Sequence, residues 1–185
     1  LRLPRSLIAL TVGAALSVAG ALMQGVTRNP LADPGLLGLM AGASFAVVML
    51  SFFFGAASLY WLPWIAALGA LVTALVVYFI AHWAPGGPTP LTLTLSGAAI
   101  SAFLGAIISI AHLLNEESFD NLRVWLSGSL AGRDISMLYV TGPWIAVALV
   151  AGLALARQVT ALAMGDDVAK GLGVRTGPLK LQLLA

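Results

Sequence analysis

Long apolar runs alternate with short polar connectors along this chain. Five of the runs contain no Asp, Glu, Lys or Arg. Each is roughly twenty residues long, and at a helical rise of about 1.5 Å per residue that length crosses a hydrocarbon core of roughly 30 Å. The pattern predicts an all-α, polytopic transmembrane helical bundle with five full spans and the start of a sixth. The expected spans are residues 7–24, 35–54, 61–81, 91–114 and 137–156.

The composition indicates a membrane protein and argues against several other classes of protein and site. Apolar residues make up 60% of the 185 positions and charged residues only 9%, whereas a soluble domain carries about 25% charged residues. A transmembrane barrel would give a much weaker hydropathy signal. The net charge of +2 is too small to indicate a nucleic-acid partner. Cysteine is absent, which excludes a disulfide framework and thiolate metal sites, and no cofactor is expected.

The first polar connector, at residues 28–34, reads RNPLADP. Its two prolines prevent either flanking helix from running through it. We therefore expect Arg28, Asn29, Pro30 and Pro34 to form a structural turn. Within it, the Asn29 side chain can satisfy backbone groups that precede the proline.

The later connectors are longer and more polar. Residues 82–90 form a breaker rich in proline and glycine, and residues 157–178 are the longest polar segment. Residues 115–136 mix acidic and basic side chains, and residues 122–130 within them are expected to form a short helix that carries Trp125.

Basic residues do not fix the orientation of the bundle. An odd number of spans places residues 28–34, 82–90 and 157–178 on one side of the membrane. Together with Lys180, that side carries five Lys or Arg residues and the opposite side carries four, so the positive-inside rule gives no decision.

Small residues mark the faces where helices are expected to meet. Gly97, Ser101, Gly105 and Ser109 recur every four residues and would form one narrow ridge along the fourth span. Such a ridge favours close helix packing, or it borders a passage for a hydrophilic cargo, or both. A GxxxG pair at residues 38–42 predicts a second close contact.

The segment at residues 161–174 reads ALAMGDDVAKGLGV. Asp166 and Asp167 open a short helical turn, where the helix dipole favours anions, and Lys170 lies near its end, where the dipole favours cations. Glycines then stop the turn. A helix this short is unstable alone, so we expect it to pack against the membrane interface or against another protein. The apolar side chains available for that contact are Val168, Leu172 and Val174.

The spans contain no charged side chain, which bears on mechanism. An ionisable group at the membrane centre costs roughly 2.5–3.5 kcal/mol on insertion scales and usually marks an ion pathway or a proton relay. An ion-coupled carrier or an intramembrane enzyme is therefore disfavoured. The chain also has no GxxxxGK[ST] pattern, and its only lysines are Lys170 and Lys180. Nucleotide energy would have to arrive through another protein.

Four spaced motifs resemble the FecCD family. They are LRLPRSLIAL, the run GAALSVAGALMQGVTRNPLADPGLLGLMAGA, Trp125 with Gly128-Ser129-Leu130, and MGDDVAKGLGV. Members of that family are permease subunits of ABC importers for iron–siderophore complexes, haem and cobalamin. The resemblance implies that this chain is part of a ten-helix permease, from its second helix to the start of its seventh. A chain that opens on Leu1 and ends in an apolar run fits that expectation.

The resemblance also implies an orientation and two regions of function. Residues 157–178 would be a cytoplasmic segment that couples to an ATPase, and residues 115–136 would be an external loop with a short gating helix. Arg2 and Arg5, in the sequence RLPR, resemble arginines of the family that receive acidic residues of a substrate-binding protein, although anchoring to lipid headgroups is the alternative.

Individual residues inherit roles from the same resemblance. Where the family commonly has Leu-Gly-Glu, this chain has Met-Gly-Asp, a conservative change. The implied coupling residues are Met164, Gly165, Asp166, Asp167, Ala169, Lys170, Leu172 and Gly173. The implied residues of the translocation path and gate are Gly97, Ser101, Gly105, Ser109, Trp125, Gly128 and Ser129.

The sequence thus predicts a transport subunit rather than an enzyme. It would be the membrane permease of an ATP-driven ABC importer in the bacterial inner membrane, carrying an iron–siderophore or a related chelate such as haem or cobalamin. Its expected partners are the lipid bilayer, a second permease subunit, identical or not, cytoplasmic ATPase subunits, and a periplasmic or lipoprotein substrate-binding protein. The alternative is an ion-coupled secondary carrier or a channel subunit.

Overall fold

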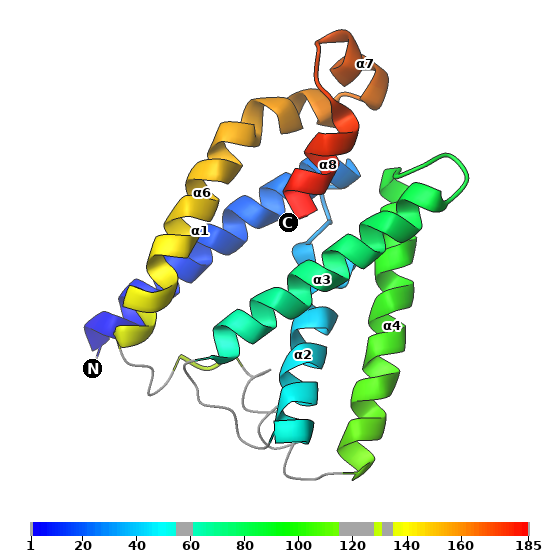
Figure 1. Cartoon of the computed structure of the whole chain (residues 1–185). Coiled ribbons are helices and arrows are strands. Elements are labelled where there is room, and N and C mark those ends of the chain that lie inside the picture. Colours follow the sequence, from blue (N-terminus) through cyan, green and yellow to red (C-terminus); the bar gives the residue numbers. More distant parts are fainter. Residues whose placement is uncertain (1, 55–60, 115–127, 131–134, 185) are drawn as a thin grey trace. The chain divides into compact units, whose positions relative to one another are not determined.

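The computed structural model describes residues 2–54, 61–114, 128–130 and 135–184, and every regular element in these ranges is a helix (Figure 1). Helices α1, α3, α4 and α6 are long and apolar enough to cross a membrane. The predicted all-α fold with several spans is confirmed. The elements are α1 (Arg2–Thr27), η1 (Pro34–Leu37), α2 (Leu39–Phe54), α3 (Leu62–Trp83), α4 (Pro90–Leu114), α6 (Ser136–Ala163), α7 (Asp166–Gly171) and α8 (Thr176–Leu184).

The helices fall into two compact units. Helices α1, α6, α7 and α8 belong to one of them, which we call the α1–α6 unit. The 3₁₀ turn η1 and helices α2, α3 and α4 belong to the other, which we call the α2–α4 unit.

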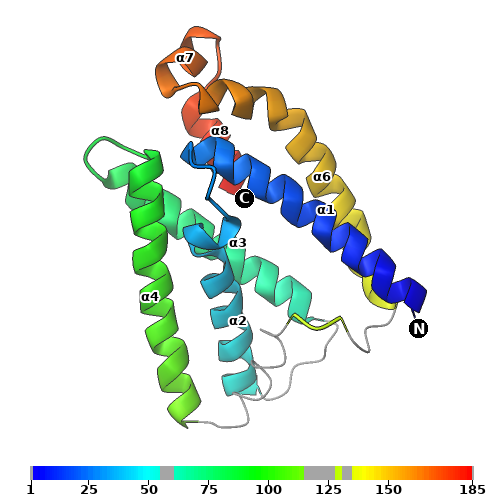
Figure 2. The ribbon, with the colours of Figure 1, turned by 180° about the vertical axis from the view of Figure 1, so that it is seen from behind.

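Helices α1 and α6 run side by side in the same direction (Figures 1 and 2). A Cβ atom at Gly152 would lie 3.0 Å from a methyl group of Val18, and further along a Cβ atom at Gly25 would clash with Val159. The contact of Val18 with Gly152 is followed, further along both helices, by that of Gly25 with Val159, so the two helices are parallel. The turn after α1 and the end of α6 therefore share one end of the unit, as the odd number of spans predicted.

Helix α6 is longer than predicted. It continues to Ala163, whereas the sequence pattern placed the end of the span at residue 156. Arg157 and Gln158 are exposed, and their long side chains are compatible with helix, so a polar surface did not mean the end of the helix.

The expected continuous span at residues 35–54 is wrong. The chain instead makes the 3₁₀ turn η1, breaks at Gly38, and then begins α2. Gly38 has a φ of +79°, a left-handed conformation that costs glycine little and other residues more. Helix α2 has 16 residues and falls short of the length that a full span needs.

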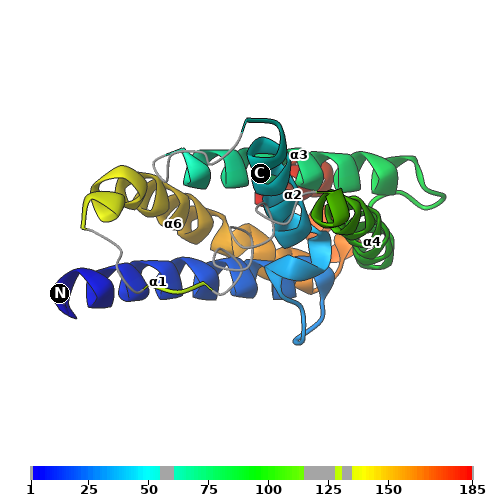
Figure 3. The ribbon, with the colours of Figure 1, turned by 90° about the horizontal axis from the view of Figure 1, so that it is seen from below.

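The α2–α4 unit is built on close approaches at glycine. A Cβ atom at Gly42 would clash with Thr73, which fulfils the contact predicted for the GxxxG pair at residues 38–42. A Cβ atom at Gly97 would lie 2.5 Å from the carbonyl oxygen of Leu36 in η1. Helix α3 crosses both α2 and α4, as the view from below also shows (Figure 3).

The small-residue ridge on α4 divides into two halves. Gly97 is buried under η1, and the Ser101 hydroxyl lies beside Gly38. Nothing within the described chain lies within 4 Å of a Cβ atom built at Gly105, and Ser109 is exposed. Close packing therefore accounts for the first half of the ridge only.

The difference between the two halves can be tested by substitution. Gly97→Leu would push a side chain into the backbone of η1, and we expect it to destabilise the fold by about 1–3 kcal/mol. Gly105→Leu is the matched control on the same helix and should leave the thermal unfolding midpoint in detergent unchanged. Equal destabilisation by both substitutions would contradict this packing.

Candidate functional site

The turn that follows α1 is held by its own side chains. The backbone N–H of Leu31 donates to Asn29 Oδ1 at 2.9 Å, so this asparagine binds a backbone group that follows Pro30 rather than one that precedes it. Gln24 Nε2 donates to the carbonyl oxygen of Pro30 at 2.9 Å and so ties the last turn of the helix to the connector. Pro34 opens η1 directly after this turn. The turn is a rigid feature at the end of α1.

Arg28 joins this turn to the end of α6. Its φ of +51° ends α1, because a left-handed residue cannot continue a right-handed helix. Its Nε donates to the carbonyl oxygen of Leu162 at 3.1 Å, and its Nη2 donates to Asp166 Oδ1. One side chain thus reaches both the last turn of α6 and the first residue of α7.

Asp166 has a second cationic partner. Lys180 Nζ, from α8, donates to Asp166 Oδ2 at 2.7 Å. The Lys180 side chain is only 4% exposed, whereas those of Arg28 and Asp166 are 34% exposed. We call these three residues the charge cluster. It connects the end of α1, the start of α7 and the middle of α8.

The charge cluster shifts the titration of its carboxyl group. Partial burial raises the pKa of Asp166, but the hydrogen bond and charge of Lys180, together with the charge and hydrogen bond of Arg28, outweigh it. The net result is a pKa below 3.8, so Asp166 carries its charge at neutral pH.

Sequence reasoning placed Asp166 at a helix start and treated Arg28 as part of a turn, but it missed that they meet. It counted Lys180 only as a topology charge. The signal that could have pointed to the cluster is a lysine set between leucines in Leu179-Lys180-Leu181, because a charge in apolar surroundings needs a partner.

Helix α7 is a six-residue element that follows a sharp turn. Gly165 has a φ of +128° and Gly173 a φ of +82°, so glycine begins and ends the segment as the sequence predicted. Ala169 is completely buried. Lys170 lies in the last turn and pairs weakly with Asp167, at 3.7 Å between exposed groups.

Two of the three apolar side chains expected to contact a partner, Val168 and Leu172, are exposed in the described chain. The side that packs within the described chain is that of Ala169, whereas Met164 is 67%, Val168 43% and Leu172 65% exposed. Beside them a hollow of about 440 Å³ contains apolar, amide and cationic groups. Its lining residues are Gln158, Leu172, Gly173, Val174, Arg175, Pro178, Leu179 and Gln182.

Other residues singled out from the sequence do not belong to α7. Arg5 is exposed near the start of α1, at the opposite end from Arg28, and Arg2 is the first residue of that helix. Trp125 lies outside the described residues, as does most of the expected gating helix. Gly128 and Ser129 are described and exposed, and the former has a φ of +60°.

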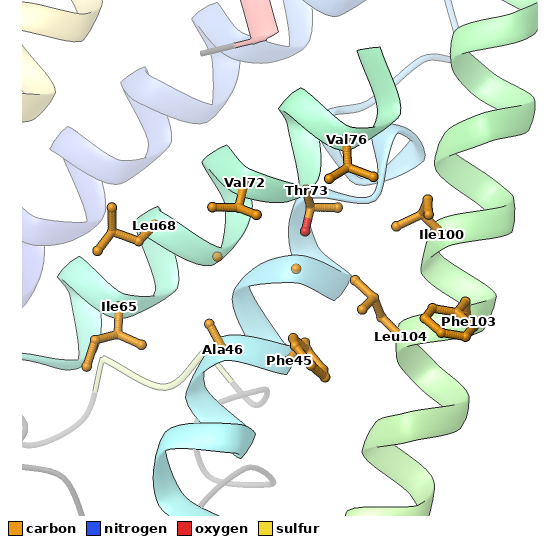
Figure 4. Close-up of a pocket in the computed structure, with 12 residues that line it drawn as sticks. Phe45, Ala46, Ile65, Leu68, Val72, Thr73, Val76, Ile100, Phe103 and Leu104 are labelled. Carbon is orange, nitrogen blue, oxygen red and sulfur yellow. The ribbon is translucent and has the colours of Figure 1, made fainter. Parts of the chain in front are cut away.

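The α2–α4 unit contains a cavity of about 460 Å³ between its three helices (Figure 4). Phe45 from α2, Leu68 and Val72 from α3, and Leu104 from α4 point toward it. Thr73 supplies the one polar side chain of the lining. A cavity this apolar offers a hydrophilic cargo almost nothing to bind, so we do not regard it as a substrate site.

Comparison with known proteins gives a consistent result. The profile of the FecCD transport family matches residues 1–185. The chain is 45% identical over 179 residues to the probable siderophore transport system permease protein YfiZ of Bacillus subtilis, covering 97% of this chain and 54% of that protein. It is 44% identical over 180 residues to the ferric enterobactin transport system permease protein FepD of Escherichia coli, with the same coverage.

A solved structure is also similar. It is a metal-chelate type ABC transporter in an inward-facing conformation, with a TM-score of 0.86 and 30% sequence identity. The match covers 99% of this chain and 58% of that one. The chain thus spans about half the length of the curated relatives it matches.

The lowered pKa of Asp166 makes a prediction about pH. The folded-state pKa lies below the ordinary value, so the carboxylate stabilises the fold above that value, and the contribution is lost as the pH falls through the folded pKa. We expect Asp166→Asn to lower the thermal unfolding midpoint near neutral pH and to have a smaller effect below about pH 4. Circular dichroism in detergent measures this, with the fully exposed Asp167→Asn as control. A deficit that stays the same at every pH would contradict it.

Proposed function

The chain belongs to the FecCD transport family, and we propose that it forms part of the membrane permease of an ATP-driven ABC importer. The cargo we propose is an iron–siderophore complex or a related metal chelate. Relatives of this chain are permease proteins named for transport of ferric enterobactin, Fe(3+)-hydroxamate, Fe(3+)-citrate and hemin. The chain would act in the bacterial inner membrane, as a transport subunit with ATP hydrolysed on a partner.

The observation that carries this proposal is the exposed apolar surface of α7. Val168 in this charged, six-residue helix, Leu172 directly after it and Met164 just before it are all exposed, beyond the end of α6. A helix this short is not stable alone, and exposed apolar side chains next to charged ones are typical of a docking surface. We propose that α7 is the core of the segment at residues 157–178 that contacts the ATPase in the cytoplasm.

The remaining candidate residues support a two-sided arrangement. With α7 in the cytoplasm, Arg2 and Arg5 lie at the opposite end of α1, outside the membrane. There they would receive acidic residues of a substrate-binding protein. The external loop at residues 115–136, including Trp125, Gly128 and Ser129, would form the gate.

Transport would follow an alternating-access scheme. The ATPase, on binding nucleotide, would shift the population of two permease packings through α7. The half of the α4 ridge that nothing covers in the described chain, Gly105 and Ser109, would face the path between this chain and a second permease subunit. A path lined by small groups binds a bulky chelate weakly and so releases it.

If α7 docks to the ATPase, substitutions at two exposed leucines should have different effects on ATPase binding. Leu172→Asp should lower recovery of the ATPase subunit with the full-length gene product by at least about tenfold, because a buried apolar anchor contributes more than about 1.4 kcal/mol to an interface. Leu31, in the turn after α1, is even more exposed than Leu172, so Leu31→Asp is the control and should retain the ATPase. Recovery unaffected by Leu172→Asp would overturn the docking role.

The same preparations discriminate a permease from a carrier. Reconstituted with its ATPase, the gene product should take up at least one of a panel of radioactive ferric enterobactin, ferric hydroxamate, ferric citrate and hemin only when ATP is present. Uptake driven by an ion gradient without the ATPase would instead support the secondary carrier.

Arg2 and Arg5 give a prediction for the external side. Arg2→Glu with Arg5→Glu should raise the concentration of substrate-binding protein needed for half-maximal uptake by roughly tenfold, because like charges at an interface cost several kcal/mol at most. Vesicle uptake titrated with the binding protein measures this. If the arginines only anchor to lipid headgroups, that concentration will not change.

A further inference from the structure

The charge cluster explains how α7 is held in position. This helix has six residues, follows a turn at Gly165, and buries one alanine completely, so its own backbone hydrogen bonds cannot fix its position. What holds its first residue is a carboxylate whose two oxygens are divided between Arg28 and Lys180. Charge-assisted bonds of this kind are the strongest hydrogen bonds available to side chains.

One of the two cations that bind Asp166 precedes it in the sequence and the other follows it. Arg28 ends α1 and also holds the last turn of α6 through the carbonyl oxygen of Leu162. Lys180 is buried in α8. A displacement of α7 cannot therefore leave α1 and α8 behind unless these bonds break and leave a buried ammonium without its carboxylate.

The neighbouring aspartate has none of these properties. The side chain of Asp167 is fully exposed, and its ion pair with Lys170 spans 3.7 Å between exposed groups. Both aspartates stand in the first turn of the same helix and carry the same charge. A difference between them therefore reports on the cluster rather than on the helix dipole or the net charge of the segment.

We propose that Asp166 is a positioning residue for transport, which makes α7 move as one body with the ends of α1 and α8 through Arg28 and Lys180. The inference rests on the proposed docking of α7 to an ATPase. It adds that force from the ATPase enters the membrane helices through this carboxylate, since Gly165 makes the direct backbone link from α7 to α6 a turn rather than a continuous helix.

The direct test measures whether α7 stays fixed to the end of α1. These 185 residues contain no cysteine, so once any cysteine elsewhere in the full-length gene product is replaced, Leu31→Cys with Lys170→Cys places two spin labels at exposed positions, one in the turn after α1 and one on α7. In the full-length gene product assembled with its partners, the distance between the labels should be the same without nucleotide and with ATP and vanadate. Asp166→Asn should broaden that distance and make it depend on nucleotide. Asp167→Asn, which breaks no bond of the charge cluster, should keep the label distance of the parent, and Asp166→Glu should restore that distance.

Two further readouts separate positioning from folding. Asp166→Asn should retain the ATPase subunit and most ATP hydrolysis while lowering uptake of the chelate panel by roughly tenfold, within the about 5–150-fold range typical of coupling between sites. Since Arg28 acts through the same bond, Arg28→Gln combined with Asp166→Asn should be little worse than Asp166→Asn alone.

The outcomes that overturn the proposal are distinct from those that overturn the proposed function. If Asp166→Asn leaves the label distance and uptake like those of the parent protein, the positioning role is wrong. A parallel fall of folded yield, hydrolysis and uptake, with an unchanged ratio of uptake to hydrolysis, also removes it, because stability alone would then explain the variant. The proposed function fails separately, when the parent protein neither retains an ATPase nor requires ATP for uptake.

Discussion

The carboxylate of Asp166 is the interaction on which the α1–α6 unit depends at its α7 end. It binds a cation from the turn after α1 and another from α8, and one of these, Lys180, is almost completely buried. An ammonium in such surroundings is tolerable only while its partner is charged and in place, because an unpaired buried charge is among the costliest defects in a protein. The lowered pKa of Asp166 is the other side of the same interaction, since the cations that need the carboxylate also keep it ionised.

This arrangement gives α7 two different sides. Ala169 and Asp166 bind the helix to the rest of its unit, whereas Val168 and Leu172 remain exposed. Because one side of α7 is bound to its unit and the other side exposes apolar groups, a partner that binds the exposed side could transmit movement to the unit. Under the function we propose, that partner is an ATPase, and the exposed apolar surface would be where it binds.

Close approach at glycine shapes the other unit. Within a bilayer, burial of apolar surface between helices gains little over contact with lipid, so packing and hydrogen bonds must hold the helices together. Gly42 and Gly97 permit that packing, and the second of them receives the 3₁₀ turn that interrupts the expected span. Gly105 and Ser109 continue the same ridge without covering atoms in the described chain, which leaves them available for the transport path we propose.

The sequence by itself determined the class of this protein, most helix positions and the polar segments between them. These depend on local hydropathy, on proline, and on glycine at Gly165 and Gly173, all of which act over a few residues. The break at Gly38 and the continuation of α6 to Ala163 were beyond it, because a GxxxG pair and a pair of polar residues are each compatible with both outcomes. Only the tertiary structure decided that Arg28, Asp166 and Lys180 meet, and which half of the α4 ridge is covered. Residues separated by more than a hundred positions are brought together by the parallel packing of α1 on α6, and no local pattern encodes the register of two helices.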